Sequence, residues 1–407
     1  MTKYKLGEII LKIMDFRGKT PKKLGMNWTE NNRDILAISA KNVKNGKLIN
    51  LDKAHYGNEE LYKKWMKEGD IKKGDLLLTS EAPLGESFLV SKPFKAIISQ
   101  RIFLLRPNPE IIDSWYFYLL STTSIFKKKL QERATGTTVL GIKQKELLKI
   151  EVDIPNLKKQ REIVKKIRPI ILKSELNEKI NTNLLRQIKL ISNSYFSYFE
   201  VFDGKIPTNW KYFKLTDIAN LGTGYSYSSK DLQKNNNMAM ATIKNFNRNF
   251  GFDSRGYKEI IPIKPIKKEK YANLFDILVA HTDLTQNADI IGNAEPVLNT
   301  GNYEQIIYSM DLVKVTPKDN KISPFLLSLI LQGDMFKSHC MKYINGTTVL
   351  HLSKQALKDF ELPLPKNISD LNELDEFATK AYKTLSNNII ENTVLEKIKS
   401  TLLNTLF

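Results

Sequence analysis

The sequence has 407 residues, which exceeds one ordinary domain and predicts two or three. Lysine and arginine number 63 against 44 acidic residues, and the net charge of +19 favours a polyanionic partner such as nucleic acid. The single cysteine excludes an intrachain disulfide and favours the cytoplasm. The sequence has no apolar run long enough for a membrane span and does not begin with the basic and then apolar residues of a signal peptide, so we expect no membrane contact.

The first part of the chain, residues 1–155, predicts a mixed α/β domain. Short apolar strands are expected over residues 76–78 and 102–105, and a helix from about residue 114 to 131 begins after Asp113, a good N-cap residue. A Gly-Thr-Thr turn at 136–138, a short helix and an apolar strand that ends at Pro155 follow. The sheet order is not readable from this pattern.

A long helix is expected next, within residues 156–199. Seam positions recur with alternating spacings of four and three from Ile163 to Tyr195, which is the heptad pattern of a coiled coil. Asn177 and Asn181 occupy two of these positions. The outer face of this segment is strongly basic, which is typical of a solvated helix surface.

The remainder of the chain repeats this plan. Gly136-Thr-Thr-Val-Leu recurs as Gly346-Thr-Thr-Val-Leu, and the strand ending at Pro155 recurs with Pro365, both 210 positions later. Earlier matches, such as Lys41-Asn42 with Lys244-Asn245, lie at a smaller offset, so insertions and deletions concentrate in the middle of each unit. An internal duplication therefore gives a second similar domain over residues 200–365.

The last segment, residues 366–407, predicts a second long helix. The same spacing runs from Leu374 to Leu406, and Asn388 and Asn392 align with the two asparagines of the first helix. Polar residues at a seam fix its register at a cost in stability, so we predict an antiparallel coiled coil with a pseudo-twofold axis. The alternative is two separate solvent-exposed helices with incidental asparagines.

Several ordered motifs resemble those of the specificity subunits of type I restriction–modification systems. They are Ile206-Pro-Thr-Asn-Trp210 with Leu215-Thr-Asp-Ile218 after it, the paired Gly-Thr-Thr segments, and Pro155 followed by Gln160-Arg-Glu-Ile-Val164. The first unit lacks the Pro-x-x-Trp entry, and the second helix opens with Leu371-Asn-Glu-Leu-Asp375 instead of a Gln-Arg-Glu-Ile run. The resemblance covers essentially the whole chain.

The resemblance implies two target recognition domains, each reading one half of a split and asymmetric DNA site. The helices would set the spacing of the half-sites and dock two DNA-methyltransferase (modification) subunits, through which restriction subunits join the complex. S-adenosylmethionine, ATP and magnesium would be bound by those partners. This chain itself would carry no cofactor and no catalytic residue.

The catalytic motifs that we considered are incomplete. Arg17-Gly18-Lys19-Thr20 lacks the first glycine of a phosphate-binding loop, Leu221-Gly-Thr-Gly224 has no methyltransferase tetrapeptide to accompany it, and His339-Cys340 has no second pair at zinc-ligand spacing. We therefore expect no metal site. The alternatives are the recognition subunit of a related two-subunit restriction–modification enzyme, an autonomous nuclease or methyltransferase, and a plain coiled-coil assembly protein.

Candidate DNA contacts are polar and basic residues in the irregular middle of each unit and in its closing turn, because such side chains bind phosphates and base edges. In the first unit they are Arg17, Lys19, Lys41, Asn42, Ser80, Gln100, Arg101, Thr137, Thr138 and Lys143. In the second unit they are Lys230, Lys244, Asn245, Arg248, His281, Thr282, Thr347, Thr348 and Lys354. The Lys-Asn pairs and the Gly-Thr-Thr turns have structural alternatives as strand ends and corners.

Overall fold

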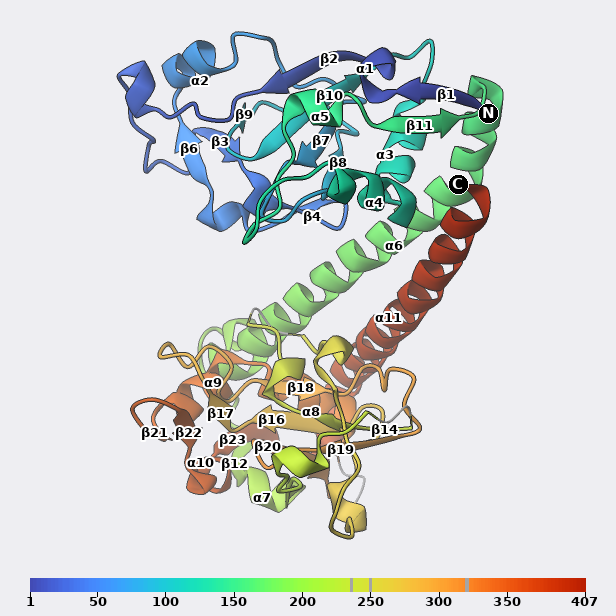
Figure 1. Ribbon diagram of the computed structural model, residues 1–407. Helices are drawn as coiled ribbons and strands as arrows, with labels where there is room; N and C mark the ends of the chain where they lie inside the picture. The colour runs from blue at the N-terminus through green and yellow to red at the C-terminus, as the bar shows by residue number, and fades with distance from the viewer. Residues whose placement is uncertain (235–236, 249–250, 319–321) are drawn as a thin grey trace. The chain divides into compact units, whose positions relative to one another are not determined.

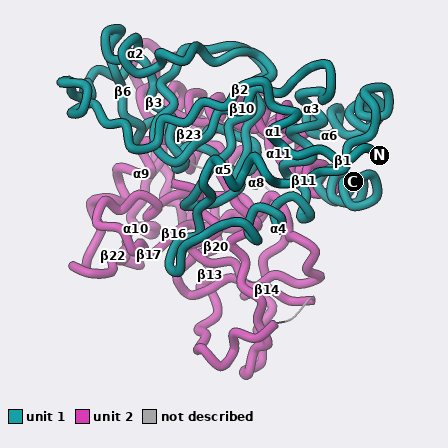
Figure 2. Tube along the Cα trace, turned by 45° about the horizontal axis from the view of Figure 1, so that its top comes forward, with its two compact units in different colours: residues 1–173, 395–407 teal, residues 174–394 magenta. Residues whose placement is uncertain are grey.

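The computed structural model describes residues 1–234, 237–248, 251–318 and 322–407 (Figure 1). The chain divides into two compact units, residues 1–173 with 395–407, and residues 174–394 (Figure 2). Each unit holds one globular domain and a part of both long helices. Among the described residues, no helix is both long and apolar enough to cross a bilayer.

The first domain is built on four small sheets. The two-stranded sheet pairs β1 (Thr2–Lys5) with β11 (Glu151–Ile154), so the two ends of the domain lie side by side. The four-stranded sheet has the order β2 (Ile10–Asp15), β10 (Ile102–Pro107), β7 (Leu76–Thr79) and β8 (Ser87–Leu89). The other sheets are β6 (His55–Gly57), β3 (Ile35–Ile38) and β9 (Ile97–Ile98), and the hairpin β4 (Val43–Lys44) and β5 (Lys47–Leu48).

The helices of the first domain are short. They are α1 (Leu6–Ile9), α2 (Glu59–Trp65), α3 (Ser114–Thr122), α4 (Ser124–Glu132) and α5 (Gln144–Leu147), with 3-10 turns η1 (Lys22–Leu24), η2 (Ala40–Asn42) and η3 (Leu51–Lys53). The single helix predicted from about 114 to 131 is wrong in one respect. The chain breaks at Thr123, which has an extended conformation and whose hydroxyl accepts a hydrogen bond from the Phe126 N–H at 3.2 Å.

The apolar sequence runs account for the core of this domain. All four residues of β7 are buried, as expected for a strand inside a sheet that is covered on both faces. One cluster fills the space between this sheet, α3, α4 and β11, and a second cluster fills the space between the sheet and the β3 sheet. The domain is therefore held by two apolar layers, one on each side of the four-stranded sheet.

The second domain repeats the same strand order. Its two-stranded sheet pairs β12 (Trp210–Lys214) with β23 (Glu361–Pro365). The four-stranded sheet has the order β13 (Ala219–Thr223), β20 (Leu312–Pro317), β16 (Ile277–Ala280) and β18 (Ala294–Pro296), and the next sheet β15 (Lys258–Glu259), β14 (Met238–Ala241) and β19 (Gln305–Tyr308). A further sheet joins β17 (Thr282–Asp283), β22 (Leu350–Leu352) and β21 (Ile344–Asn345).

The helices of the second domain follow the same plan. They are α7 (Leu215–Ile218), α8 (Pro324–Leu331), α9 (Asp334–Met341) and α10 (Lys354–Asp359), with 3-10 turns η5 (Glu200–Phe202), η6 (Ser229–Asp231), η7 (Ile243–Asn245), η8 (Ser254–Gly256), η9 (Lys268–Lys270) and η10 (Ile368–Leu371). The Ser323 hydroxyl caps α8 by accepting from the Leu326 N–H, and Pro324 is its first residue. The predicted order of helix, turn, short helix and strand is observed in both domains.

Matched polar contacts strengthen the correspondence. In the first domain Asp75 is buried and accepts two hydrogen bonds of 2.8 Å from the Arg106 guanidinium. In the second domain Asp276 takes this place, and the Lys314 ammonium lies 3.3 Å from its carboxylate. Both aspartates follow residues with positive φ, and in the second domain that residue is Phe275 at +70°. The aspartate before this strand is therefore duplicated, although its cation comes from different positions of β10 and β20.

Two long helices complete the chain, α6 (Leu157–Ser192) and α11 (Asn372–Leu406), and a π-helical turn, η4 (Asn193–Ser197), follows α6. The start of α6 and the end of α11 belong to one unit, and the end of α6 and the start of α11 belong to the other. The helices therefore run antiparallel. The predicted architecture, two similar α/β domains each followed by a helix of a coiled coil, is confirmed.

Candidate nucleic-acid interface

The Gly-Thr-Thr segments form matched exposed corners. Gly136 and Gly346 have φ values of +120° and +104°, and a Cβ on either would lie 2.2 or 2.3 Å from the carbonyl oxygen three residues later. Only glycine fits such a turn without strain. The threonines that follow each glycine are exposed in both domains. The fold thus presents two hydroxyl-bearing side chains at the same corner of each domain.

A charged pair lies beside this corner in the first domain. The Arg101 Nε lies 2.7 Å from Glu81 Oε1, and about half of the Arg101 side chain is exposed. Glu81 forms a backbone bridge with Gly141, at the end of the Gly-Thr-Thr segment. Arg101 has a φ of +65°, so its backbone is held in the left-handed region immediately before β10. The guanidinium is therefore presented from a fixed backbone position.

The matched position in the second domain has the opposite charge. Asp311 stands immediately before β20, as Arg101 stands before β10, and its Oδ1 lies 3.4 Å from the Thr282 hydroxyl. Thr282 pairs across the sheet with His351, as Glu81 pairs with Gly141, and its hydroxyl lies 3.4 Å from His351 Nδ1. The two domains have the same backbone arrangement at this place and differ in the charge of the side chain that precedes the strand.

The two Lys-Asn pairs occupy equivalent 3-10 turns, η2 and η7. Asn42 is buried, accepts a hydrogen bond from the Ser39 N–H at 3.0 Å and donates to the carbonyls of Ile49 and Asn50. Asn245 is buried in the same way between the Thr242 N–H and the Asp253 carbonyl. Both asparagines hold a turn, and the preceding lysines are exposed.

Four of the predicted contacts of the first domain lie around one cavity. Lys41, Asn42, Gln100 and Arg101 line a cavity of about 400 Å³, together with Trp28 and His55, which no sequence motif indicated. The Trp28 and His55 rings are stacked, with centroids 5.3 Å apart and planes 7° apart. The two rings are 27 positions apart in an irregular part of the sequence, and no local pattern relates them.

Other predicted residues of the first domain are engaged inside the fold. The Arg17 guanidinium binds the Asp15 carboxylate and the Ile142 carbonyl, and it lies 4.3 Å from the centroid of the Phe103 ring. The Lys19 ammonium donates to the Trp65 carbonyl at 2.6 Å, and burial lowers its pKa. Ser80 is fully buried, whereas Lys143 is exposed.

The predicted residues of the second domain also divide into buried and exposed ones. His281 is 9% exposed, and burial, assisted by the positive charge of Lys354, lowers the pKa of its imidazole to about 4. It is therefore neutral near pH 7 and does not offer a cation to a phosphate. Thr282 is also buried. Lys230, Arg248 and Lys354 are exposed, and Arg248 lies 3.7 Å from Asp289.

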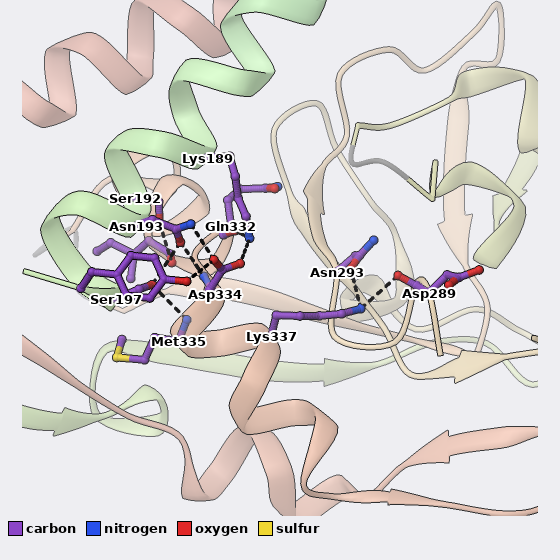
Figure 3. A network of polar contacts seen from close by, with 12 residues as sticks. Lys189, Ser192, Asn193, Ser197, Asp289, Asn293, Gln332, Asp334, Met335 and Lys337 are labelled. Atoms are coloured by element: carbon purple, nitrogen blue, oxygen red, sulfur yellow. Dashed lines mark hydrogen bonds and ion pairs between the residues drawn. The ribbon is translucent and has the colours of Figure 1, made fainter. Parts of the chain in front are cut away.

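A polar network fixes the loop that carries Asp289 (Figure 3). The Lys337 ammonium donates to the carbonyls of Ala288, Asp289 and Ile291 and to Asn293 Oδ1 at 2.9 Å. Burial lowers the pKa of this ammonium to about 8. Four acceptors around one partly buried nitrogen hold the loop on α9.

A second cluster in the same figure joins α6 to this domain. The Lys189 ammonium lies 2.5 Å from Asp334 Oδ1, and Asn193 both donates to the Asp334 carboxylate and accepts from its backbone N–H at 2.7 Å. Gly333 lies against this joint, because a Cβ there would be 2.7 Å from the Ser192 hydroxyl. The end of α6 is thus fastened to the start of α9.

The seam asparagines bind one another across the helices. Asn177 donates to Asn392 Oδ1 at 3.0 Å, and Asn388 donates to Asn181 Oδ1 at 2.8 Å. Asn392 also donates to the Ser174 carbonyl. From the first pair to the second, the residue number rises by four on α6 and falls by four on α11. The two helices therefore pair in an antiparallel register.

Apolar side chains lie on the outer faces of both helices. In the second unit these are Leu176 on α6 and Ile390 and Val394 on α11, each close to half exposed. In the first unit they are Leu172 on α6 and Ile398 on α11. None of the five is at a seam position of the heptads.

The described part of the chain contains no group of three or more histidine, cysteine, aspartate or glutamate residues that could hold a metal ion. The lone thiol, Cys340, is buried, and burial raises its pKa to about 12. A thiol in this state is a poor nucleophile.

Two proteins of Methanocaldococcus jannaschii have similar sequences. The type I restriction enzyme MjaVIII specificity subunit is 26% identical over 361 residues, which cover 83% of this chain and 78% of that protein. The type I restriction enzyme MjaIX specificity subunit is 22% identical over 389 residues, which cover 92% and 86%.

The crystal structure of the type I restriction–modification system S subunit from M. genitalium has a similar fold. The similarity covers 100% of this chain and 96% of that chain, with a TM-score of 0.58 and 15% sequence identity. The family model of the type I restriction modification DNA specificity domain matches residues 1–186 and 207–400, one segment for each half of the duplication. The chain therefore belongs to the family of type I restriction–modification specificity subunits, and its role is the recognition of a DNA target.

Proposed function

We propose that this chain is the non-catalytic specificity subunit of a type I restriction–modification complex and recognises a two-part, asymmetric DNA target. The domains would be residues 1–155 and 200–365, each reading one half-site, with helical segments over 156–199 and 366–407 between and after them. One observation carries the proposal. Two domains with the same strand order present opposite charges, Arg101 and Asp311, at the same position of the frame.

These two residues favour different bases. An arginine guanidinium donates two hydrogen bonds to the O6 and N7 of guanine, whereas a carboxylate accepts from the amino group of cytosine. Arg101 is held on a left-handed backbone position and Asp311 by the hydroxyls of Thr282 and Ser309. Different residues on a shared frame would make the two half-sites differ, and the whole target would be asymmetric.

The exposed members of the predicted set would supply the remaining contacts. They are Lys41, Gln100, Thr137, Thr138 and Lys143 in the first domain and Lys230, Lys244, Arg248, Thr347, Thr348 and Lys354 in the second. Arg17, Lys19, Asn42, Ser80, Asn245, His281 and Thr282 are buried or engaged within the fold and would act by holding the reading residues in place.

The helices would dock two DNA-methyltransferase subunits, and restriction subunits would join through them. Both α6 and α11 carry exposed apolar residues away from the seam, so each helix offers a face for one partner. S-adenosylmethionine, ATP and magnesium would be bound by these partners. We place the complex in the cytoplasm, because the single cysteine is free and buried and the chain needs no oxidising compartment to form a disulfide.

Methylation mapping tests this function. The chain would be expressed with its modification partner, and methylated adenines would be located by sequencing the host DNA. We expect one motif with two different halves and a spacer of fixed length. Methylation of an uninterrupted or palindromic motif would contradict the reading of two half-sites. Methyl transfer or cleavage by the purified chain alone, with DNA, Mg²⁺ and a labelled methyl donor, would contradict a non-catalytic role.

A further inference from the structure

The cavity of the first domain has one aromatic wall. Trp28 lies against the fully buried Trp65, with ring centroids 5.5 Å apart, so its position is fixed by the core. His55 stacks on Trp28 and is itself exposed. A planar group that enters the cavity can therefore stack on a ring that a rigid tryptophan supports.

The rest of the lining is polar and cationic. Lys41 and Lys53 bring positive charge to the cavity beside Arg101, which is paired with Glu81, and Gln100 brings an amide that both donates and accepts hydrogen bonds. None of the described residues that line the cavity is a carboxylate. The volume of about 400 Å³ lies at the lower end of the range for pockets that enclose small ligands. These properties suit a flat heterocycle attached to a phosphate chain.

At the corresponding place in the second domain, two backbone segments come close together. The segment that matches the cavity wall around Lys53 is η8, and a Cβ on its Gly256 would lie 2.3 Å from the Lys244 carbonyl oxygen. The ring pair is also replaced. Lys258 is the equivalent of His55, because it pairs with β14 as His55 pairs with β3. Its ammonium lies 5.3 Å from the centroid of the Tyr227 ring. The second domain thus has a cation where the first has a stacking ring.

We propose that the cavity of the first domain receives one base of its half-site after that base has left the DNA stack. The base would stack on His55 and meet Gln100 with its hydrogen-bonding edge, while Lys41 and Lys53 bind the adjacent phosphates. Extrusion costs the stacking and pairing of the base, and stacking on an aromatic side chain restores part of this loss. This inference rests on the proposed function, since it requires a DNA half-site at the first domain.

The experiment uses the full chain and duplexes that contain the target found by methylation mapping. 2-Aminopurine, which fluoresces more strongly once it is unstacked, is placed at each position of the first half-site in turn. We expect the emission to rise on binding at one position only. The same rise should be absent with His55→Ala, whose side chain is exposed and whose loss leaves the core intact.

A thermodynamic cycle then tests whether His55 holds that base. An abasic nucleotide at the identified position should weaken binding of the unaltered chain about tenfold. His55→Ala should weaken binding of intact DNA to a similar extent and should lose nothing further on abasic DNA. Lys258→Ala in the second domain is the matched control, and its loss should be the same on both duplexes.

The outcomes separate the two claims. Normal target affinity with no emission change at any position, or additive losses in the cycle, would overturn the cavity as a base site and leave the proposed function intact. Failure of the unaltered chain to prefer the mapped target over other DNA would overturn both.

Discussion

The side-chain nitrogen of Asn388 donates a hydrogen bond of 2.8 Å to the side-chain oxygen of Asn181, across the seam of the two long helices. Asn388 is 9% exposed, so its amide has little access to water. One turn further along, Asn177 and Asn392 form the second such pair. Polar pairs inside an apolar seam favour the one register in which both amides find partners.

Replacing one member of the pair should cost more than replacing both. Asn388→Leu leaves the Asn181 amide without its donor, and we expect the free energy of unfolding to fall by about 1–3 kcal/mol. The double variant Asn181→Leu/Asn388→Leu should recover this loss, because two apolar residues now meet. Urea denaturation measures both values. Asn387→Leu, at an exposed neighbouring position, should change the free energy by less than about 0.5 kcal/mol. A double variant as unstable as the single would contradict the pairing.

The buried carboxyl of Glu295 should make the stability of the second domain depend on pH. Burial raises the pKa of this group to about 7 from an ordinary 4.5, while hydrogen bonds from Gly251 and Gln332 oppose the rise. Between about pH 4.5 and pH 7, the folded state therefore keeps a proton on Glu295 that the unfolded chain has released. The contribution of Glu295 to the free energy of unfolding is fully present below about pH 4.5 and is lost as the pH rises through 7.

Glu295→Gln removes this dependence because an amide stays neutral. The variant should match the unaltered chain at pH 5 and exceed it at pH 8 by at most about 3 kcal/mol, from 1.36 kcal/mol for each pKa unit. Urea denaturation at the two pH values gives the comparison. Glu304→Gln changes an exposed carboxylate of the same domain and should preserve the difference between the two pH values. Equal gains from Glu295→Gln at pH 5 and pH 8 would refute the linkage.

The matched ion pairs of the two domains should differ in their importance. Asp75 is 1% exposed and binds Arg106 through two hydrogen bonds, so Asp75→Ala leaves a largely buried guanidinium with only the Asp70 carbonyl as acceptor and should destabilise the first domain by about 3–5 kcal/mol. Asp276→Ala should cost less, since the Asp276 side chain is 20% exposed and lies 3.3 Å from the Lys314 ammonium. Hydrogen exchange resolved by domain measures each effect. A larger loss with Asp276→Ala would contradict this comparison.

Two neighbouring cations should affect DNA binding differently. Arg101→Ala should reduce discrimination at one base pair of the first half-site by about 1–3 kcal/mol, because a bidentate base contact is lost. Lys41→Ala should weaken binding to all sequences alike and lower the slope of log affinity against log salt by about one, as expected for one phosphate contact. Anisotropy titrations on single-substitution duplexes at several salt concentrations distinguish the two. A uniform loss with Arg101→Ala would exclude a base-reading role.

Spacing in the sequence was sufficient to predict the architecture. The two Gly-Thr-Thr corners, 210 positions apart, each need a positive-φ glycine, so the same short motif marks both of them in the sequence. The seam asparagines occupy heptad positions, which the local periodicity shows directly. The break at Thr123 was missed, since one hydroxyl cap inside an apolar run leaves no periodic signal.

The pairs that distinguish the two domains could not be predicted. Glu81 and Arg101 are 20 positions apart and meet only because β7 and β10 are neighbours in the sheet. The order of strands in a sheet cannot be predicted from the local sequence. The same holds for Thr282 and Asp311. Trp28 and His55 face one another across irregular segments, so the cavity that they form follows from tertiary packing alone.

An exchange of domains tests the central claim most directly. Residues 200–365 are replaced with a second copy of residues 1–155, and the methylated motif is mapped in cells that also express the modification partner. Two copies of one reading domain on antiparallel helices should select a palindromic target, in which the first half-site occurs twice in inverted orientation. Retention of the original asymmetric target after the exchange would show that the domains do not each read one half-site.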